Sequence, residues 1–253
     1  MLHKISNILI TGASSGIGEA LALHYAKNDA KNLFISGRNK QRLQDVGQKC
    51  QELGANVYPK IIDVADKENM HKWIRECNDI AELDLVFANA GVSTGEENEI
   101  NIYNTFNTNI FGVLNTITPA IEIYKKQQNK TKIIAITSSI AGYHGLPACP
   151  SYSATKACVK AYGEALRGNL HELGIQVSVI CPGFVKSRIT DKNTCPMPFF
   201  MSAEKAAEII AERLDKNIGL IAFPLPMRLA VWIMSILPNR ISDFIYARLP
   251  HKV

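Results

Sequence analysis

The chain has 253 residues, of which 47% are hydrophobic and 20% are charged. This length suits one sizeable domain, and this composition excludes disordered and collagen-like chains. The formal net charge of +5 would suit a polyanionic ligand, but the lysines and arginines form no cluster or stripe. We therefore expect a solvated basic surface and no nucleic-acid partner.

The six cysteines lie far apart, without a C-x-x-C pair or a histidine at metal-ligand spacing, so neither a disulfide framework nor a metal site is predicted. The N-terminal residues run directly into an apolar stretch and a glycine turn, which leaves no room for a signal peptide. The longest apolar run, Leu229–Leu237, is well short of the roughly 20 residues that span a bilayer. We expect a cytoplasmic protein.

Short β-branched runs alternate with longer segments of helical periodicity along most of the chain. This pattern predicts an α/β fold, a doubly wound parallel sheet of seven strands with helices on both faces. The predicted strands are Asn7–Thr11, Asn32–Ser36, Asn56–Val64, Leu83–Ala88, Lys132–Ser138, Gln176–Cys181 and Leu220–Phe223. The predicted helices are Ile17–Asn28, Gln41–Leu53, Lys67–Asp79, roughly Ile100–Gln127, Tyr152–Leu173 and Ala203–Lys216.

Two stretches break the alternation, so we divide the chain into a main domain, residues 1–223, and a C-terminal helical extension, residues 224–253. Within the main domain, residues 186–202 are rich in turn formers yet carry apolar side chains, which predicts a lid over an apolar pocket or a surface crossover. The extension has short apolar helical patterns at Met227–Leu237 and Ile241–Leu249. It could lie on a membrane surface, bury itself in a partner subunit or pack on its own domain.

A glycine-rich turn follows the first predicted strand and precedes a predicted helix. Glycines let the chain turn tightly, bring its backbone close to a pyrophosphate and pack the helix against the sheet. The free N–H groups of the helix N-terminus add a partial positive charge. We therefore predict a dinucleotide-binding turn whose contacts are Gly12, Ser14, Ser15, Gly16, Ile17 and Gly18.

The choice of cofactor should depend on the end of the second strand, where a carboxylate would bind the ribose hydroxyls of NAD. The residues there are Ser36-Gly37-Arg38, so a guanidinium stands where the 2′-phosphate of NADP would lie. This favours NADP(H), with NAD(H) as the alternative. Arg38 could also be only an exposed residue at the start of a helix.

Tyr152 and Lys156 are four residues apart at the start of a predicted helix, so their side chains project from the same face. A tyrosine packed on the core beside a solvated lysine would have the same spacing. The surrounding sequence favours a catalytic pair. A strand ends at Ser138-Ser139, thirteen residues before Tyr152, and an Asn-Ala-Gly turn follows the fourth strand.

The resulting pattern resembles that of the short-chain dehydrogenases/reductases over most of the chain, and it implies a Rossmann-type fold. The matching residues are the T-G-x-x-x-G-x-G turn, Ala88-Asn89-Ala90-Gly91, Asn109, Ser139, Tyr152, Lys156 and Pro182-Gly183. The family's spacing favours Ser139 over Ser138, and the Gly three residues further on favours Asn109 over Asn107. Ala88 departs from the family, which often has a second Asn there, and Ser187 departs from its usual Thr.

The resemblance implies a catalytic tetrad of Asn109, Ser139, Tyr152 and Lys156, with Asn109 helping to position a water beside Lys156. It also implies that Lys156 binds the nicotinamide ribose. The further cofactor contacts implied are Asp63, Val64, Asn89, Ala90, Gly91, Tyr152, Pro182, Gly183, Val185 and Ser187. Asp63 could equally well be a helix N-cap.

The chemistry of a phenol explains why a lysine is needed beside Tyr152. Lowering a phenol pKa by about 3 units from its usual value near 10 takes roughly 4 kcal/mol of preferential stabilisation of the phenolate. The Lys156 ammonium, aided by the positive ring of an oxidised nicotinamide, is expected to supply it. Ser139 is expected to hold the substrate oxygen, while Tyr152 donates or accepts the proton during hydride transfer.

These residues predict an NADP(H)-dependent oxidoreductase that acts on a carbonyl or alcohol, favouring reduction of a hydrophobic molecule of a lipid-like kind. His144 and Leu146, with Ser139 and Tyr152, are the expected substrate contacts. A catalytically silent dinucleotide-binding sensor or scaffold is the alternative from another class, and a sugar-nucleotide epimerase or dehydratase is a third. The family resemblance implies a homodimer or homotetramer, and peripheral membrane contact through the extension is a further expectation.

Overall fold

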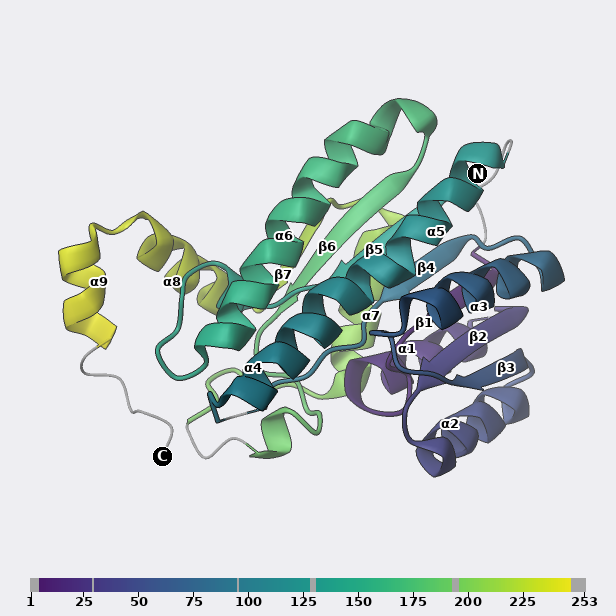
Figure 1. The fold of residues 1–253 in the computed structure, drawn as a ribbon, viewed down its shortest axis with the longest axis horizontal. Coiled ribbons are helices and arrows are strands. Elements are labelled where there is room, and N and C mark those ends of the chain that lie inside the picture. Colours follow the sequence, from purple (N-terminus) through teal and green to yellow (C-terminus); the bar gives the residue numbers. More distant parts are fainter. Residues whose placement is uncertain (1–4, 29, 95, 128–130, 193–195, 247–253) are drawn as a thin grey trace.

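The computed structural model describes residues 5–28, 30–94, 96–127, 131–192 and 196–246. Within these residues, seven parallel strands form one sheet in the order β3-β2-β1-β4-β5-β6-β7 (Figure 1). The strands are β1(Asn7–Ile10), β2(Asn32–Gly37), β3(Asn56–Ile61), β4(Leu85–Ala88), β5(Ile133–Thr137), β6(Gln176–Pro182) and β7(Leu220–Phe223). The predicted fold class is confirmed. The strand order reverses between β1 and β4, and α/β sheets bind ligands outside the carboxyl ends of such strands.

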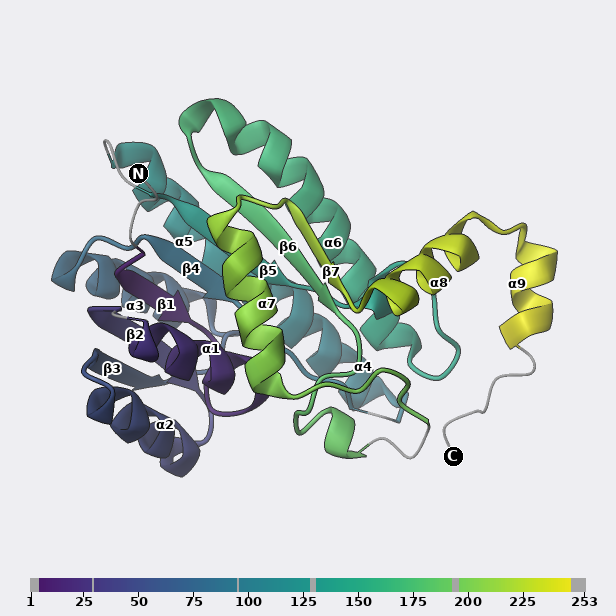
Figure 2. The same ribbon diagram turned by 180° about the vertical axis from the view of Figure 1, so that it is seen from behind.

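Helices cover both faces of this sheet. They are α1(Gly16–Lys27), α2(Lys40–Glu52), α3(Lys67–Ile80), α4(Glu99–Phe106), α5(Gly112–Lys126), α6(Pro150–Leu170), α7(Ala203–Asp215), α8(Leu225–Ile236) and α9(Asn239–Tyr246). Figure 1 shows α4, α5 and α6 in front of the sheet, and Figure 2 shows α1 and α7 on the opposite face.

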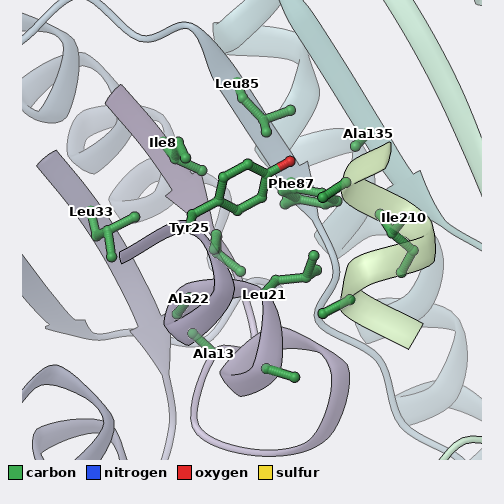
Figure 3. Packing of buried hydrophobic residues seen from close by; sticks show 14 of the residues in the cluster. Ile8, Ala13, Leu21, Ala22, Tyr25, Leu33, Leu85, Phe87, Ala135 and Ile210 are labelled. Atoms are coloured by element: carbon green, nitrogen blue, oxygen red, sulfur yellow. The ribbon is translucent and has the colours of Figure 1, made fainter. Parts of the chain in front are cut away.

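Alternate residues of each central strand enter hydrophobic clusters on opposite faces. Ile8 and Ile10 of β1 pack with α1, α2 and α7, whereas Leu9 packs with α3 and α5. Figure 3 shows the first cluster, where Tyr25 of α1 lies beside Phe87 of β4, with ring centroids 6.3 Å apart. A strand buried on both faces must be apolar at every position, which is why these strands appear in the sequence as continuous apolar runs.

The long helix predicted near residues 100–127 is confirmed, but it is not uniform. It consists of α4, a π-helical turn η1(Asn107–Phe111) and then α5, with the Gly112 N–H bonded to the Asn107 carbonyl five residues earlier. Apolar spacing continues through the segment and does not reveal the widened turn. Such π turns are frequent at functional sites, and this one contains the buried Asn109.

The C-terminal extension projects from the domain beside β7 (Figures 1 and 2). The first predicted helical pattern is confirmed as α8. The second corresponds to α9, and its last three predicted residues lie outside the described range. α8 contacts β7 and the 3-10 turn η2(Ile140–Gly142), but none of its residues is buried. Among the described residues, no helix has both the length and the apolar character needed to cross a bilayer.

Candidate active site

A cleft of about 380 Å³ lies along the ends of the strands, a volume in the ordinary range of small-molecule sites. It gathers residues from eight separate segments between β1 and the loop after β6. The predicted site residues that line it are Gly12, Ser14, Ser15, Gly16, Ile17, Arg38, Asp63, Val64, Asn89, Ala90, Gly91, Ser139, Tyr152, Lys156, Pro182, Gly183, Val185 and Ser187. Gly18, Asn109, His144 and Leu146 are not among the lining residues.

The glycine turn has a geometry that only glycine accepts readily. Gly12 and Gly16 have φ values of +68° and +60°, in the left-handed region. A Cβ on Gly12 would lie 2.7 Å from Ala90 Cα, and one on Gly18 would collide with the carbonyl oxygen of Gly12. Gly18 therefore does not line the cleft but lets α1 pack closely beneath it.

A network of hydrogen bonds braces this turn against the neighbouring strands. Asn89 Nδ2 donates to the carbonyl oxygen of Thr11 at 3.1 Å, and Thr137 Oγ1 donates to Asn89 Oδ1 at 3.3 Å. The N–H groups of Asn89 and Ala90 donate to Thr11 Oγ1 at 3.0 and 3.2 Å. Asn89 thus joins the ends of β1, β4 and β5. This structural role is separate from its predicted contact with a cofactor.

These features fit a dinucleotide. The turn exposes the N-terminus of α1 to the cleft, and in the described structure the N-cap Ser15 makes no side-chain capping hydrogen bond. Backbone N–H groups in that position are suited to a pyrophosphate. A side chain on Gly16 would meet Ser187 Cβ at 2.9 Å, so the chain after β6 closes directly against the same turn.

The other end of the cleft carries the residues that should face the adenosine. Arg38 follows β2 and makes a 3.5 Å contact from its Nη1 to Asp63 Oδ2. Asp63 is not a helix N-cap, since Asp66 caps α3 by accepting from the Asn69 N–H. The alternative structural role for Asp63 is therefore wrong, and its carboxylate lies beside the guanidinium.

Arg42 is a basic residue of the cleft that sequence reasoning missed. It lies four residues after Arg38, lines the same part of the cleft, and has a buried Nε without a hydrogen-bond partner in the described chain. A second arginine so close to Arg38 could have indicated it, and Asn39 caps α2 between them by accepting from the Arg42 N–H. Further lining residues that were missed include Val92, Ser93, Arg188 and Ile189.

At the catalytic end, the two adjacent serines have different partners. Ser138 Oγ donates to the carbonyl oxygen of Lys156 at 2.7 Å, which ties β5 to α6. Ser139 Oγ accepts from the Ala141 N–H at 3.1 Å and hydrogen-bonds to Tyr152. Ser138 is thus engaged with the backbone of α6, and the choice of Ser139 as the catalytic serine stays a prediction.

Lys156 is buried beneath Tyr152. Its Nζ donates to the carbonyl oxygen of Thr137 at 2.9 Å and lies 5.6 Å from the centre of the Tyr152 ring. Burial lowers the pKa of Lys156 to about 8. A buried ammonium of this kind loses its charge at a pH where exposed lysines keep theirs.

Among the protein's own groups, burial dominates the ionisation of Tyr152. It raises the pKa of Tyr152 to about 12, against the lowering effect of the hydrogen bond with Ser139. The phenol is therefore protonated at neutral pH and suited to donate a proton. The lowering expected from Lys156 together with an oxidised nicotinamide stays a prediction.

Asn109 lies behind the cleft wall. Its Nδ2 donates to the Val92 carbonyl oxygen at 2.9 Å and to Thr155 Oγ1 at 3.1 Å, while its Oδ1 accepts from the Val92 N–H at 2.8 Å. Both amide hydrogens are used, so the side chain holds the loop after β4 against α6. The predicted part of Asn109 in positioning a water stays a prediction.

The predicted lid begins at the cleft and then leaves it. Ser187 and Thr190 form a compact turn in which the Ser187 N–H donates to Thr190 Oγ1 at 2.8 Å. Met201 returns to pair with Val185, whereas the side chains of Phe199 and Phe200 are exposed. Residues 193–195 lie outside the described range.

The predicted substrate contacts His144 and Leu146 lie in the loop before α6 and are both half-buried. Neither residue lines the cleft, and the Leu146 N–H donates to Ser153 Oγ at 3.2 Å. Their contact with a substrate stays a prediction.

A parallel sheet that ends in such a cleft is the dinucleotide-binding architecture found in many oxidoreductases. The family model described as short chain dehydrogenase matches residues 6–196. The chain therefore belongs to the short-chain dehydrogenase/reductase family, and it is an NAD(P)-dependent oxidoreductase that acts on carbonyl or alcohol groups.

Several known proteins are similar to this chain over nearly its whole length. An uncharacterized oxidoreductase of Myxococcus xanthus is 33% identical over 247 residues, covering 95% of this chain and 96% of that protein. The 11-beta-hydroxysteroid dehydrogenase-like 4A protein of Arabidopsis thaliana is 31% identical, covering 92% and 81%. The crystal structure of levodione reductase has the same fold, with a TM-score of 0.80 at 20% identity, covering 90% of this chain and 99% of that one.

Proposed function

We propose that the protein is an NADP(H)-dependent reductase of hydrophobic carbonyl compounds. The observation that carries the cofactor preference is the pair Arg38 and Arg42, which line the cleft where β2 ends without a carboxylate. Two guanidiniums match the charge and geometry of a 2′-phosphate, whereas the unphosphorylated ribose of NAD would lack its acidic partner.

The residues at the other end support reduction. When bound, the nicotinamide supplies the hydride. The Tyr152 hydroxyl, protonated at neutral pH, donates its proton to the carbonyl oxygen, and Ser139 Oγ donates a hydrogen bond to the same oxygen. The Lys156 ammonium stabilises the phenolate that forms, because it lies beneath the ring in a buried environment.

Apolar cleft residues support a hydrophobic substrate. Val92, Val185 and Ile189 line the cleft that contains Tyr152, and residues 186–202 act in this proposal as a lid that begins at the cleft wall. The similarity to a hydroxysteroid dehydrogenase-like protein favours the same class of substrate.

The test is turnover of purified protein with NADPH or NADH and a panel of apolar and polar carbonyl compounds. We expect oxidation of NADPH only when an apolar carbonyl is present, and slower oxidation of NADH. Faster turnover with NADH would overturn the cofactor preference. Tight binding of NADPH without turnover of any compound would favour the silent sensor or scaffold.

We also propose that the extension lies on an anionic lipid surface, close to where an apolar substrate would be dissolved. Leu229, Trp232 and Ile236 of α8 are each about half exposed or more. Residues 224–253 contain four basic side chains and one acidic one, a charge balance that complements anionic lipid. We expect sedimentation with vesicles of anionic lipid and not with neutral ones; recovery in the supernatant from both would overturn this.

We propose that the protein is a cytoplasmic homo-oligomer, either a dimer or a tetramer. Cys50, Cys77, Cys158 and Cys181 carry free thiols, which suits a reducing compartment. Ile100, Tyr103 and Phe111 expose apolar side chains along α4 and η1, where a second copy would bury them. Light scattering that shows a monomer at micromolar concentration would overturn the oligomer.

A further inference from the structure

The loop between β4 and α4 is tied to the catalytic helix α6 on both sides of Tyr152, directly through Glu97 and indirectly through Asn109 of η1. At the start of the loop, Val92 is held by Asn109, whose Nδ2 also donates to Thr155 Oγ1 at 3.1 Å. Near its end, Glu97 Oε1 accepts from the Ser151 N–H at 3.0 Å and from Ser151 Oγ at 2.8 Å. Ser151 and Thr155 are one helical turn apart, so the contacts bracket Tyr152.

Glu97 caps the N-terminus of α6, which has no cap from its own N-cap residue. The N-cap position holds Cys149, whose Sγ lies 3.7 Å from Ser153 Oγ instead of capping the helix. Pro150 has no N–H, so the first N–H of α6 is that of Ser151. A carboxylate at a helix N-terminus satisfies such a donor and is stabilised by the helix dipole. Glu97 supplies it from 54 residues earlier in the chain.

The same loop forms part of the cleft. Val92 and Ser93 line it together with Ser139 and Tyr152, whereas Glu97 does not. The next residue after Glu97, Asn98, caps α4 by accepting from the Asn101 N–H at 2.9 Å. Consecutive side chains thus cap different helices, and the end of the loop is anchored to both α4 and α6.

We propose that Glu97 is a positioning residue for catalysis: its carboxylate holds the β4–α4 loop and the first turn of α6 together, so that Tyr152 faces the substrate across Val92 and Ser93. The inference rests on the proposed role of Tyr152 as proton donor. It assigns Glu97 no contact with substrate or cofactor. The glycine turn, where the cofactor contacts are expected, is a different part of the cleft. Loss of the Glu97 carboxylate should therefore affect turnover and not cofactor binding.

Four variants separate geometry from charge. Glu97→Ala removes the acceptor, and Glu97→Gln keeps an acceptor oxygen without the charge. Ser151→Ala keeps the backbone N–H and removes only the hydroxyl. Glu96→Ala is the matched control, because it removes the neighbouring exposed carboxylate. Each is measured for kcat, for the KM of the carbonyl, and for the Kd of NADPH by fluorescence titration.

We expect Glu97→Ala to lower kcat by about tenfold, since a displacement of the order of 1 Å at the reacting group can cost even more. The Kd of NADPH should stay within twofold, Glu97→Gln should recover most of the kcat, and Glu96→Ala should equal the wild type. An unchanged kcat in Glu97→Ala would overturn the proposal, as would a Gln variant as slow as the Ala variant.

If Glu97→Ala does not fold, Glu97→Asp gives the answer, because it keeps the charge but its side chain is one methylene shorter, which draws the carboxylate away from Ser151. A wild-type kcat in folded Glu97→Asp would overturn the proposal, and a selective loss of kcat would support it. Tyr152→Phe is measured alongside. Unchanged turnover in Tyr152→Phe would show that the proposed proton donor is wrong, which is distinct from a failure of Glu97 to position it.

Discussion

The two ends of the cleft differ in how firmly their side chains are held. At the catalytic end, Ser139 and Lys156 are 7% and 2% exposed, and each is hydrogen-bonded to backbone. At the adenosine end, the side chains of Arg38 and Asp63 are 55% and 45% exposed and meet at 3.5 Å. Hydride transfer needs reacting groups in one geometry, whereas an exposed phosphate site needs mainly charge.

This difference predicts how substitutions should behave. Changes at the buried end should produce large losses of turnover that depend little on salt, because buried groups are poorly screened. Changes at the exposed end should produce small, salt-dependent losses of cofactor affinity. The following experiments test that contrast, beginning with the largest expected effect.

Tyr152→Phe should lower kcat by about 1,000-fold, since it removes the proton donor, and general acid catalysis contributes about 10²–10⁴-fold. The affinity for NADPH should be preserved, which a fluorescence titration would show. Tyr143→Phe is the matched control: the Tyr143 hydroxyl is buried without a hydrogen-bond partner in the described chain, so its removal should leave kcat unchanged. Equal losses in both variants would contradict the assignment.

The neighbouring serines should separate catalysis from stability. Ser139→Ala should lower kcat by about 100-fold, the order seen when one donor to a reacting oxygen is removed. Ser138→Ala should instead cost about 1 kcal/mol of the free energy of unfolding, because its buried bond to the Lys156 carbonyl is lost. Steady-state kinetics and thermal denaturation of both variants measure the contrast. A larger loss of kcat in Ser138→Ala would reverse the roles.

Lys156 should determine the alkaline limit of the reduction. Since burial lowers its pKa to about 8, the free enzyme loses the Lys156 charge as the pH rises through that value, while Tyr152 stays protonated to about 12. The kcat/KM for NADPH reports groups of the free enzyme, so it should fall by about tenfold per pH unit above 8. A flat profile from pH 7 to 10 would show that Lys156 keeps its charge.

The smallest effect is expected at the arginines. Arg42→Ala should weaken NADPH binding by about fivefold, equivalent to roughly 1 kcal/mol, with little change for NADH. Raising the salt concentration should reduce the difference between wild type and variant. Titrations with both cofactors at low and high salt would measure it. An equal loss for NADPH and NADH would mean that Arg42 supports the cleft without contacting a 2′-phosphate.

Much of the architecture is determined by local sequence. The apolar runs of β1, β4 and β5 follow from burial on both faces, and the positive φ values of Gly12 and Gly16 follow from a turn that other residues resist. Such features depend on neighbouring residues in the chain. The strands and the glycine turn could therefore be predicted from the sequence, as could the family pattern.

Tertiary packing decided the features that depend on distant segments. The helix widens to a π turn at Asn109 although the apolar spacing continues, and Asn109 bonds there to Val92 and Thr155, which are distant in the chain. The capping of α6 by Glu97 has no local signal, since a carboxylate 54 residues away can pair with Ser151 only after the sheet has brought β4 and α6 together.

The family pattern, the glycine turn and the Tyr152–Lys156 pair are properties of the sequence by itself, because short-range sterics and helical spacing define them. The folded chain determines which polar atoms meet at the cleft and how deeply each is buried. It therefore also determines whether their pKa values rise or fall. Hydrogen bonds and desolvation act over a few ångströms in space, and the linear order of residues does not contain those distances.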